Sequence, residues 1–151
     1  MATKTLTKPI FSGRYVHALD PKNRITIPAD WRFTDNDPFY VIPHQSNACL
    51  VVMPPEEFQK VRTDAENNEG ISAQKRRIFI REFYSRAQLC VADKQGRLLL
   101  PEEHCKKIGL EQGVILLGTD SRFEIWNPKR REESLPTHEA VFNEMADEMG
   151  I

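Results

Sequence analysis

The chain repeats one short pattern twice, and this repeat constrains the fold more than any other feature of the sequence. The pentapeptide DPKNR (Asp20–Arg24) precedes ITIP (25–28), and DKQGR (Asp93–Arg97) precedes LLLP (98–101). In both copies Asp and Arg stand four positions apart, and a proline ends the apolar stretch that follows. The sequence therefore predicts two copies of one small module within 151 residues.

Each pentapeptide has the composition of a hairpin loop. Asp20 suits the first position of a type I turn, and Asn23 tolerates the left-handed conformation that a following bulge requires. Gly96 supplies the same conformation in the second copy without a side chain to strain. Apolar segments flank the first turn at 15–19 and 25–27, so the turn is predicted to join two short strands.

The two copies continue alike after their turns. Pro28 and Pro101 fit the first turn of a short helix, and Gly109 fits the end of the second one. Apolar stretches predict the remaining strands at 39–42, 50–53, 89–92, 98–100, 114–117 and 123–126. Each module is expected to run strand, turn, strand, short helix, strand, strand.

The repeat divides the chain into segments. The expected order is a flexible basic arm (1–10), module 1 (11–54), a helical connector (55–86), module 2 (87–128) and a C-terminal helical tail (129–151). Within the connector, the polar residues around Asn67 and Gly70 are expected to end one helix before Ser72 caps the next. In the tail, apolar residues at helical spacing predict a helix over 137–149. The fold class expected from this order is α+β, mainly β.

Charge is unevenly distributed along the chain. The formal net charge is −1, yet residues 1–32 carry six basic against two acidic side chains, and residues 75–86 carry five against one. A polyanion responds to a local basic surface rather than to the net charge, so this composition is compatible with DNA binding. The 75–86 cluster is interpreted as the solvated face of a helix, with a second phosphate-binding stripe as the alternative.

The sequence lacks the signatures of several other function classes. It contains no phosphate loop, H-E-x-x-H motif, nucleophile elbow or glycine-rich dinucleotide turn. The three cysteines, Cys49, Cys90 and Cys105, are widely spaced. This spacing argues against a disulfide framework or a zinc site and favours a reducing compartment. No apolar run reaches the roughly 18 residues of a membrane span. We expect a cytoplasmic protein that is not an enzyme, with no catalytic residues, metal, cofactor, small-molecule substrate or membrane partner.

The doubled turn, the proline after each following strand and the closing Phe123–Trp126 resemble the MraZ family of bacterial proteins. The resemblance runs from about Phe11 to Trp126. It implies tandem AbrB-like swapped-hairpin β-barrel modules in a ring-shaped homo-oligomer. It also implies a nucleoid-associated transcriptional regulator that binds direct repeats of double-stranded DNA in the promoter of its own division and cell-wall gene cluster. Asn23 departs from the glycine usual in the first turn, which leaves the turn intact at a modest cost.

In the family the Asp-to-Arg turn is the DNA-binding element. The candidate DNA-binding residues of this chain are therefore Asp20, Lys22, Asn23, Arg24, Asp93, Gln95 and Arg97. By their chemistry, Arg24 can bind a phosphate or guanine O6 and N7, while Lys22 suits a phosphate. Asp20 is expected to accept backbone N–H bonds within the turn and to orient Arg24.

Simpler interpretations stay open beside this one. Each Asp–Arg pair could serve only as a turn-stabilising ion pair, and for Arg97 the two interpretations carry equal weight. Because Gln95 stands where the first turn has Lys22, the first turn is the stronger DNA-binding candidate. For the whole chain, the alternatives are an antitoxin-like or protein-binding oligomer of the same fold and, after these, a small hydrolase.

Overall fold

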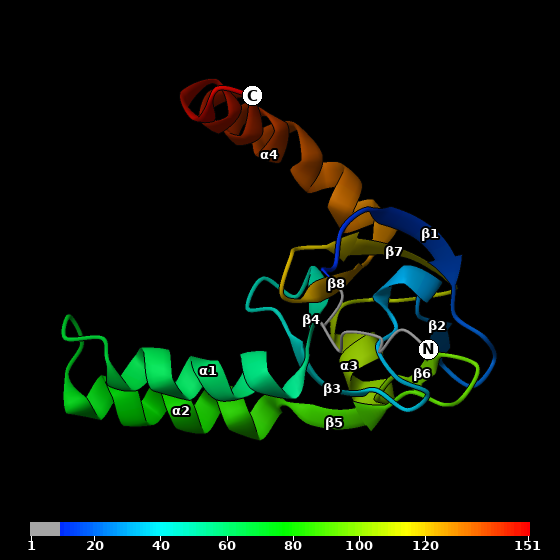
Figure 1. The fold of residues 1–151 in the computed structure, drawn as a ribbon, viewed down its shortest axis with the longest axis horizontal. Helices are drawn as coiled ribbons and strands as arrows, with labels where there is room; N and C mark the ends of the chain where they lie inside the picture. Colours follow the sequence, from blue (N-terminus) through cyan, green and yellow to red (C-terminus); the bar gives the residue numbers. More distant parts are fainter. Residues whose placement is uncertain (1–9) are drawn as a thin grey trace, which may run out of the picture.

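The fold combines antiparallel strands with helices at its edge, which confirms the expected class, α+β and mainly β (Figure 1). The computed structural model describes residues 10–151, so the predicted basic arm lies outside the described residues except for Ile10. The strands are β1 (Arg14–Ala18), β2 (Arg24–Thr26), β3 (Pro38–Pro43), β4 (Cys49–Met53), β5 (Gln88–Val91), β6 (Arg97–Leu99), β7 (Gly113–Gly118) and β8 (Phe123–Trp126). Every predicted strand is present, with ends that differ from the prediction by one residue at most.

The strands of the two copies are interleaved in the sheets. A six-stranded sheet has the order β1-β7-β8-β4-β3-β5, and β2 pairs with β6 in a separate two-stranded ribbon. The pairing is symmetric on exchange of the copies: β1 with β7 corresponds to β5 with β3, while β4–β8 and β2–β6 each join equivalent strands. All of these pairs are antiparallel.

The interleaving corrects the expected hairpins. The turn after β1 closes through the bond from the Asp20 amide to the Arg24 carbonyl, 3.0 Å, but β1 and β2 then diverge instead of pairing. β1 forms a five-residue ladder with β7, and β2 forms a three-residue ladder with β6. The local sequence specifies the turn, whereas the long-range partner of each flanking strand depends on the shared core.

The main core draws its side chains from both copies. Ile25 and Val41 of the first copy and Leu98 and Leu116 of the second are fully buried in one cluster. Trp31 anchors it: its ring packs against neighbouring aromatic rings, and its Nε1 donates to the Ser12 carbonyl at 2.9 Å. Neither copy encloses this core alone, which agrees with the small apolar surface of a single module.

Short helical turns follow β2 and β6 at equivalent positions. They are the 3-10 helix η1 (Ala29–Trp31) and helix α3 (Glu102–Lys107). Pro28 and Pro101 stand at the N-caps and not, as predicted, inside the first turns, because the backbone is still extended at each proline, with ψ of 141° and 132°. Gly109 follows the end of α3 with φ +66°, the conformation expected of it.

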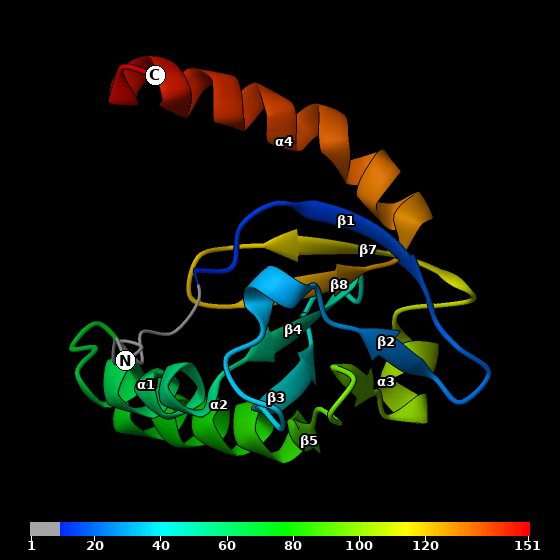
Figure 2. The same cartoon turned by 45° about the vertical axis from the view of Figure 1, so that its right-hand side comes forward.

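The connector forms a helical hairpin that projects from the sheet (Figures 1 and 2). Its helices are α1 (Pro55–Glu66) and α2 (Ala73–Arg86). The predicted break lies between them, and Ser72 caps α2 by accepting from the Lys75 amide at 3.2 Å. The Phe58 ring stacks on Tyr40 of β3 at 3.9 Å between ring centroids, and the Tyr84 hydroxyl donates to the Phe58 carbonyl. These contacts fix the base of the hairpin on the sheet.

The C-terminal helix α4 (Pro128–Met149) is longer than predicted. It begins before residue 137 because Asn127 Oδ1 caps it, accepting from the amides of Lys129 and Arg130, and it continues through Pro136. Its start packs on the sheet, where Arg131 lies over the Trp126 ring, and its remainder runs away from the body (Figure 2). Within residues 10–151, no helix is both long and apolar enough to cross a membrane.

Candidate nucleic-acid interface

The β2–β6 ribbon has one buried and one exposed face. In its antiparallel register Arg24 pairs with Leu99, Ile25 with Leu98 and Thr26 with Arg97. Side chains alternate between faces along a strand, so Ile25 and Leu98 point into the core, where both are fully buried. The outer face carries Arg24, Thr26, Arg97 and Leu99. The ribbon thus holds two arginines at diagonal positions, about 7–8 Å apart by the usual cross-strand geometry.

The two turns at the ends of the ribbon have the same backbone geometry. In the first, the Asn23 amide donates to the Asp20 carbonyl at 3.0 Å, and Asn23 has φ +62°. In the second, the Gly96 amide donates to the Asp93 carbonyl at 2.9 Å, and Gly96 has φ +77°. Both are three-residue loops with a bulge at the left-handed residue, as the sequence predicts.

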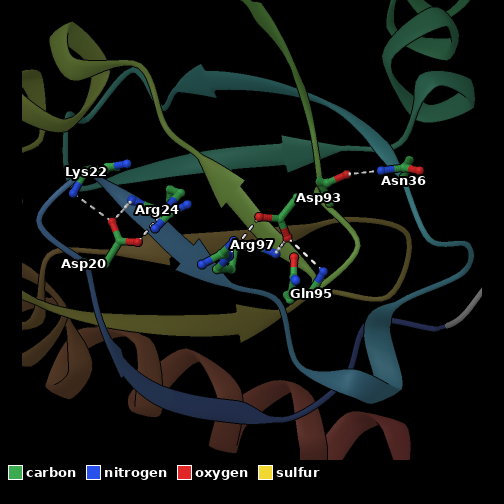
Figure 3. Close-up of polar contacts among 8 residues, drawn as sticks. Asp20, Lys22, Arg24, Asn36, Asp93, Gln95 and Arg97 are labelled. Atoms are coloured by element: carbon green, nitrogen blue, oxygen red, sulfur yellow. Dashed lines mark hydrogen bonds and ion pairs between the residues drawn. The ribbon is translucent and has the colours of Figure 1, made fainter.

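Each aspartate binds its own turn and the arginine four residues on. Asp20 accepts the amides of Lys22 and Arg24 at 2.9 and 2.8 Å, and its second oxygen accepts Arg24 Nε at 2.6 Å (Figure 3). Asp93 accepts the amides of Gln95 and Arg97 at 3.0 and 2.9 Å and Arg97 Nε at 2.8 Å. The expected contacts of Asp20, and the ion pairs of the simpler interpretation, are therefore both present.

The hydrogen bonds also determine the charge state of the two carboxylates. The backbone amides of Arg24 and Arg97, followed by the guanidinium bonds, hold the pKa of Asp20 and of Asp93 below the usual range. Both carboxylates are therefore ionised at neutral pH. The ion pairs are partly exposed, with side chains 26–27% exposed in the first turn and 36–37% in the second, and such pairs add little stability.

The geometry of the pairs leaves the outer end of each guanidinium available. Asp20 and Asp93 bind the Nε atoms, and no other acceptor among the described residues bonds Arg24 or Arg97. The terminal nitrogens of both arginines can therefore donate to a ligand. An Arg with its stem held by a carboxylate and its Nη atoms unused is preorganised for bidentate recognition of a phosphate or a guanine edge.

The β2–β6 ribbon and the two turns at its ends hold all seven predicted residues, and they carry three further exposed residues that the sequence reasoning did not name. Lys22 and Gln95 are exposed at the turn tips, and Asn23 is half-buried beside Lys22. The missed residues are Lys94, Thr26 and Leu99. Lys94 gives the second turn a cation that a position-by-position comparison of Lys22 with Gln95 overlooks, although counting the basic residues in each turn would have found it.

Arg32 makes the two turns unequal. Its Nε donates to the Ile27 carbonyl at 2.9 Å, and its guanidinium lies so close to Gly96 that a Cβ there would overlap Nε and Cζ. The residue equivalent to Arg32 in the other copy is Cys105, whose short side chain is in the core. Asn23 instead borders an open groove. This contact explains how the first turn tolerates Asn where the second has Gly.

A Gly96→Asn substitution should lower the free energy of unfolding by about 0.5–1.5 kcal/mol, the usual net contribution of one hydrogen bond, because the exposed Arg32 side chain must move away and lose its bond to the Ile27 carbonyl. The left-handed backbone itself accepts Asn, because Asn23 has a similar φ in the first turn. The loss of stability therefore comes from displacement of the Arg32 side chain. Urea denaturation followed by circular dichroism measures it. Asn23→Gly should be nearly neutral, and Arg32→Ala should recover part of the loss in the Gly96→Asn background. Equal stability of Gly96→Asn and the unchanged protein would contradict the role of Arg32.

The described residues include no group of three or more His, Cys, Asp or Glu side chains that could hold a metal ion. The three cysteines are buried and free, and burial raises the pKa of the Cys49 thiol to about 12 and that of Cys90 to about 11. At neutral pH these thiols are protonated, and we assign them to packing.

The fold and its surface define a class of small β protein in which two sequence copies interleave and present a ribbon with two anchored arginines. Sequence comparisons identify the family. The family description “MraZ protein, putative antitoxin-like” matches residues 83–149. The chain is 34% identical to the transcriptional regulator MraZ of Heliobacterium modesticaldum over 142 residues, 91% of this chain and 98% of the relative. The chain therefore belongs to the MraZ family.

Further relatives agree with this assignment. The transcriptional regulator MraZ of Syntrophobacter fumaroxidans is 36% identical over 126 residues, 80% of this chain and 81% of the relative. That of Halothermothrix orenii is 34% identical over 145 residues, 94% of this chain and the whole of the relative. All three relatives are named as regulators and none as an enzyme, which supports the prediction that this chain is not an enzyme.

Proposed function

We propose that this protein is a transcriptional regulator that binds double-stranded DNA through the outer face of the β2–β6 ribbon. The observation that carries the proposal is the placement of Arg24 and Arg97 on that face, each held at Nε by an ionised aspartate with its terminal nitrogens unused. An anchored guanidinium loses little conformational freedom on binding, so its hydrogen bonds add more to affinity than those of a mobile side chain.

The dimensions of the ribbon suit a groove of DNA. A two-stranded antiparallel ribbon fits the major groove of B-DNA, which is about 12 Å wide. Arg24 and Arg97 then face base edges or phosphates near the centre, while Lys22 and Lys94 lie at the turn tips, where the sugar-phosphate backbone passes. In this arrangement Asp20 and Asp93 face their own turns and not the DNA. Both turns carry one lysine and one arginine, so we assign them comparable shares of the contact.

Membership of the MraZ family also supports a proposal for the target and the assembly. We propose that the DNA is a set of direct repeats in the promoter of the chain's own division and cell-wall gene cluster, in the cytoplasm at the nucleoid. We also propose a ring-like homo-oligomer of AbrB-like swapped-hairpin modules. The exchange of strand partners between the copies supports the swapped-hairpin interpretation. Exposed apolar residues on the edge strands, Val16, Leu89 and Val91, support self-association.

The test is a titration of the protein with the DNA immediately upstream of its gene, in duplexes that carry one, two or three repeats, at several salt concentrations. Affinity should rise with repeat number, because linked weak contacts add through effective concentration. Log K should fall linearly with log salt by about 0.9 for each phosphate contacted. Binding that is independent of repeat number would contradict the oligomeric mechanism, and a slope near zero would contradict phosphate contact.

Single lysine variants separate the two turns in the same titration. Lys22→Ala and Lys94→Ala should each make the slope shallower by about 0.9. The matched control is Lys60→Ala, because Lys60 is an exposed lysine of α1, away from the ribbon. If only Lys22→Ala changes the slope, the first turn dominates, as the comparison of Lys22 with Gln95 indicated.

A protein-binding role is the second candidate, and α4 favours it. Val141, Phe142, Met145 and Met149 lie exposed along this helix. An exposed apolar surface of this kind is typical of a contact with another protein or another copy. The two functions differ in the part of the chain they use: the ribbon variants should impair binding to a duplex with a single repeat, whereas Phe142→Ser should leave that binding unchanged and impair association with a protein.

A further inference from the structure

The outer face of the ribbon carries one large apolar side chain among its cations. Leu99 is 57% exposed and stands directly opposite Arg24 in the ladder, with Arg97 two residues before it on the same face. A leucine in this position contributes nothing to solubility and little to the core, whose contacts in β6 come from Leu98. Its exposure is therefore unexplained by the fold.

The symmetry of the two copies makes this residue more informative. The equivalent position in β2 is Thr26, which is also exposed and lies opposite Arg97. Arg24 and Arg97 occupy equivalent positions, so this position is arginine in both copies, and the turn before each arginine carries a lysine. Within the central ladder, the outer face thus differs between the copies only at this position, where one presents a methyl group with a hydroxyl and the other an isobutyl group.

We propose that Leu99 contacts the C5-methyl group of a thymine in the major groove of the target DNA. The inference rests on the proposed function and adds a specificity-determining residue to it. Arg24, Arg97 and Lys22 lie near Leu99 and match the charge of DNA. Within the major groove, the thymine methyl is the apolar feature that a leucine can recognise. Contact with a sugar would give affinity without discrimination between bases.

A competing occupant for Leu99 is another protein surface. Leu99 borders a groove that Leu89 and Val91 of the edge strand β5 also line, and both are about half exposed. The observation that favours DNA is the position of Leu99 within the ladder, between two anchored arginines whose free nitrogens face the same side. A protein partner in that place would bury two guanidinium groups.

Replacement of thymine by uracil tests the proposal, because it removes the methyl group and leaves the hydrogen-bonding edge unchanged. The probe is the upstream repeat duplex with one thymine at a time replaced by uracil. With the unchanged protein, at least one replacement should weaken binding about fourfold, the value for one buried methyl group. Leu99→Ala should bind the thymine and uracil duplexes equally, with the salt slope unchanged.

Ile78→Ala is the matched control, because it shortens an exposed branched apolar side chain of α2, away from the ribbon, and should keep the sensitivity to uracil. If no uracil duplex binds more weakly, or if Leu99→Ala keeps the fourfold difference, the proposal is wrong. If Leu99→Ala loses self-association in gel filtration but still binds the uracil duplex fourfold more weakly than the thymine duplex, Leu99 belongs to a protein interface. Failure of the unchanged protein to bind any duplex would instead refute the proposed function itself.

Discussion

Replacing both Arg24 and Arg97 with alanine is expected to abolish specific DNA binding while leaving the protein folded. Each bidentate contact of an arginine with a base contributes about 1–3 kcal/mol of discrimination, so two contacts together account for about thirtyfold to twenty-thousandfold in affinity. The single variants should each lose part of this affinity, because the two turns have the same geometry and equivalent anchoring bonds. Electrophoretic mobility shift with the upstream repeats measures the loss.

The control for this prediction is a third arginine in the same kind of ion pair. Arg86 bonds Glu82 four residues earlier in α2, at 2.9 Å, and lies in the basic 75–86 segment. Arg86→Ala should bind DNA normally if that segment is a solvated helix face, and weakly if it is a second phosphate-binding stripe. Thermal unfolding should be nearly unchanged in all these variants, since exposed ion pairs contribute about 0–1 kcal/mol. Normal binding by the Arg24→Ala, Arg97→Ala protein would refute the proposed interface.

Local patterns in the sequence predicted the elements of this fold well. The strands and the two turns depend on apolar runs and on residues such as Asn23 and Gly96, which act over a few positions. The pairing of strands was predicted poorly, because the partner of each strand is chosen by the common core and not by the adjacent turn. Helix α4 was predicted too short because the prediction followed the apolar residues at helical spacing in 137–149, whereas the cap at Asn127 starts the helix earlier.

The candidate site was predictable in its chemistry but not in its arrangement. The spacing of Asp20 and Arg24 was enough to predict the bonds that the carboxylate makes within the turn. Nothing in one copy indicated that Arg97 would stand diagonally opposite Arg24, since that geometry arises only when β2 pairs with β6. The contact between Arg32 and Gly96 is likewise tertiary, because it joins residues of different copies. The alternation of exposed residues along β6 could have pointed to Leu99.

Ile25→Ala and Leu98→Ala are each expected to destabilise the whole protein in one transition. The two side chains face each other across the ribbon and are fully buried. Each substitution should therefore lower the free energy of unfolding by about 2–5 kcal/mol, out of a total of about 5–15 kcal/mol for a typical domain. Both copies contribute to the core that these residues fill. Heat or urea should therefore unfold strands of both copies together, whichever copy carries the change, and calorimetry with circular dichroism measures the transition.

Two independent modules would behave differently, and this difference makes the prediction decisive for the interleaved fold. Ile25→Ala would then lower the stability of the first copy alone and split the unfolding into two steps, the second at the original temperature. In an interleaved core the two losses also share one cavity, so the double variant should depart from the sum of the single ones. Leu99→Ala is the matched control, because Leu99 is adjacent to Leu98 but exposed, and this variant should leave the temperature of the unfolding transition unchanged. The same ladder that carries the arginines on its outer face thus joins the two copies through its inner face, and a stability defect on that side should weaken DNA binding only by reducing the folded fraction.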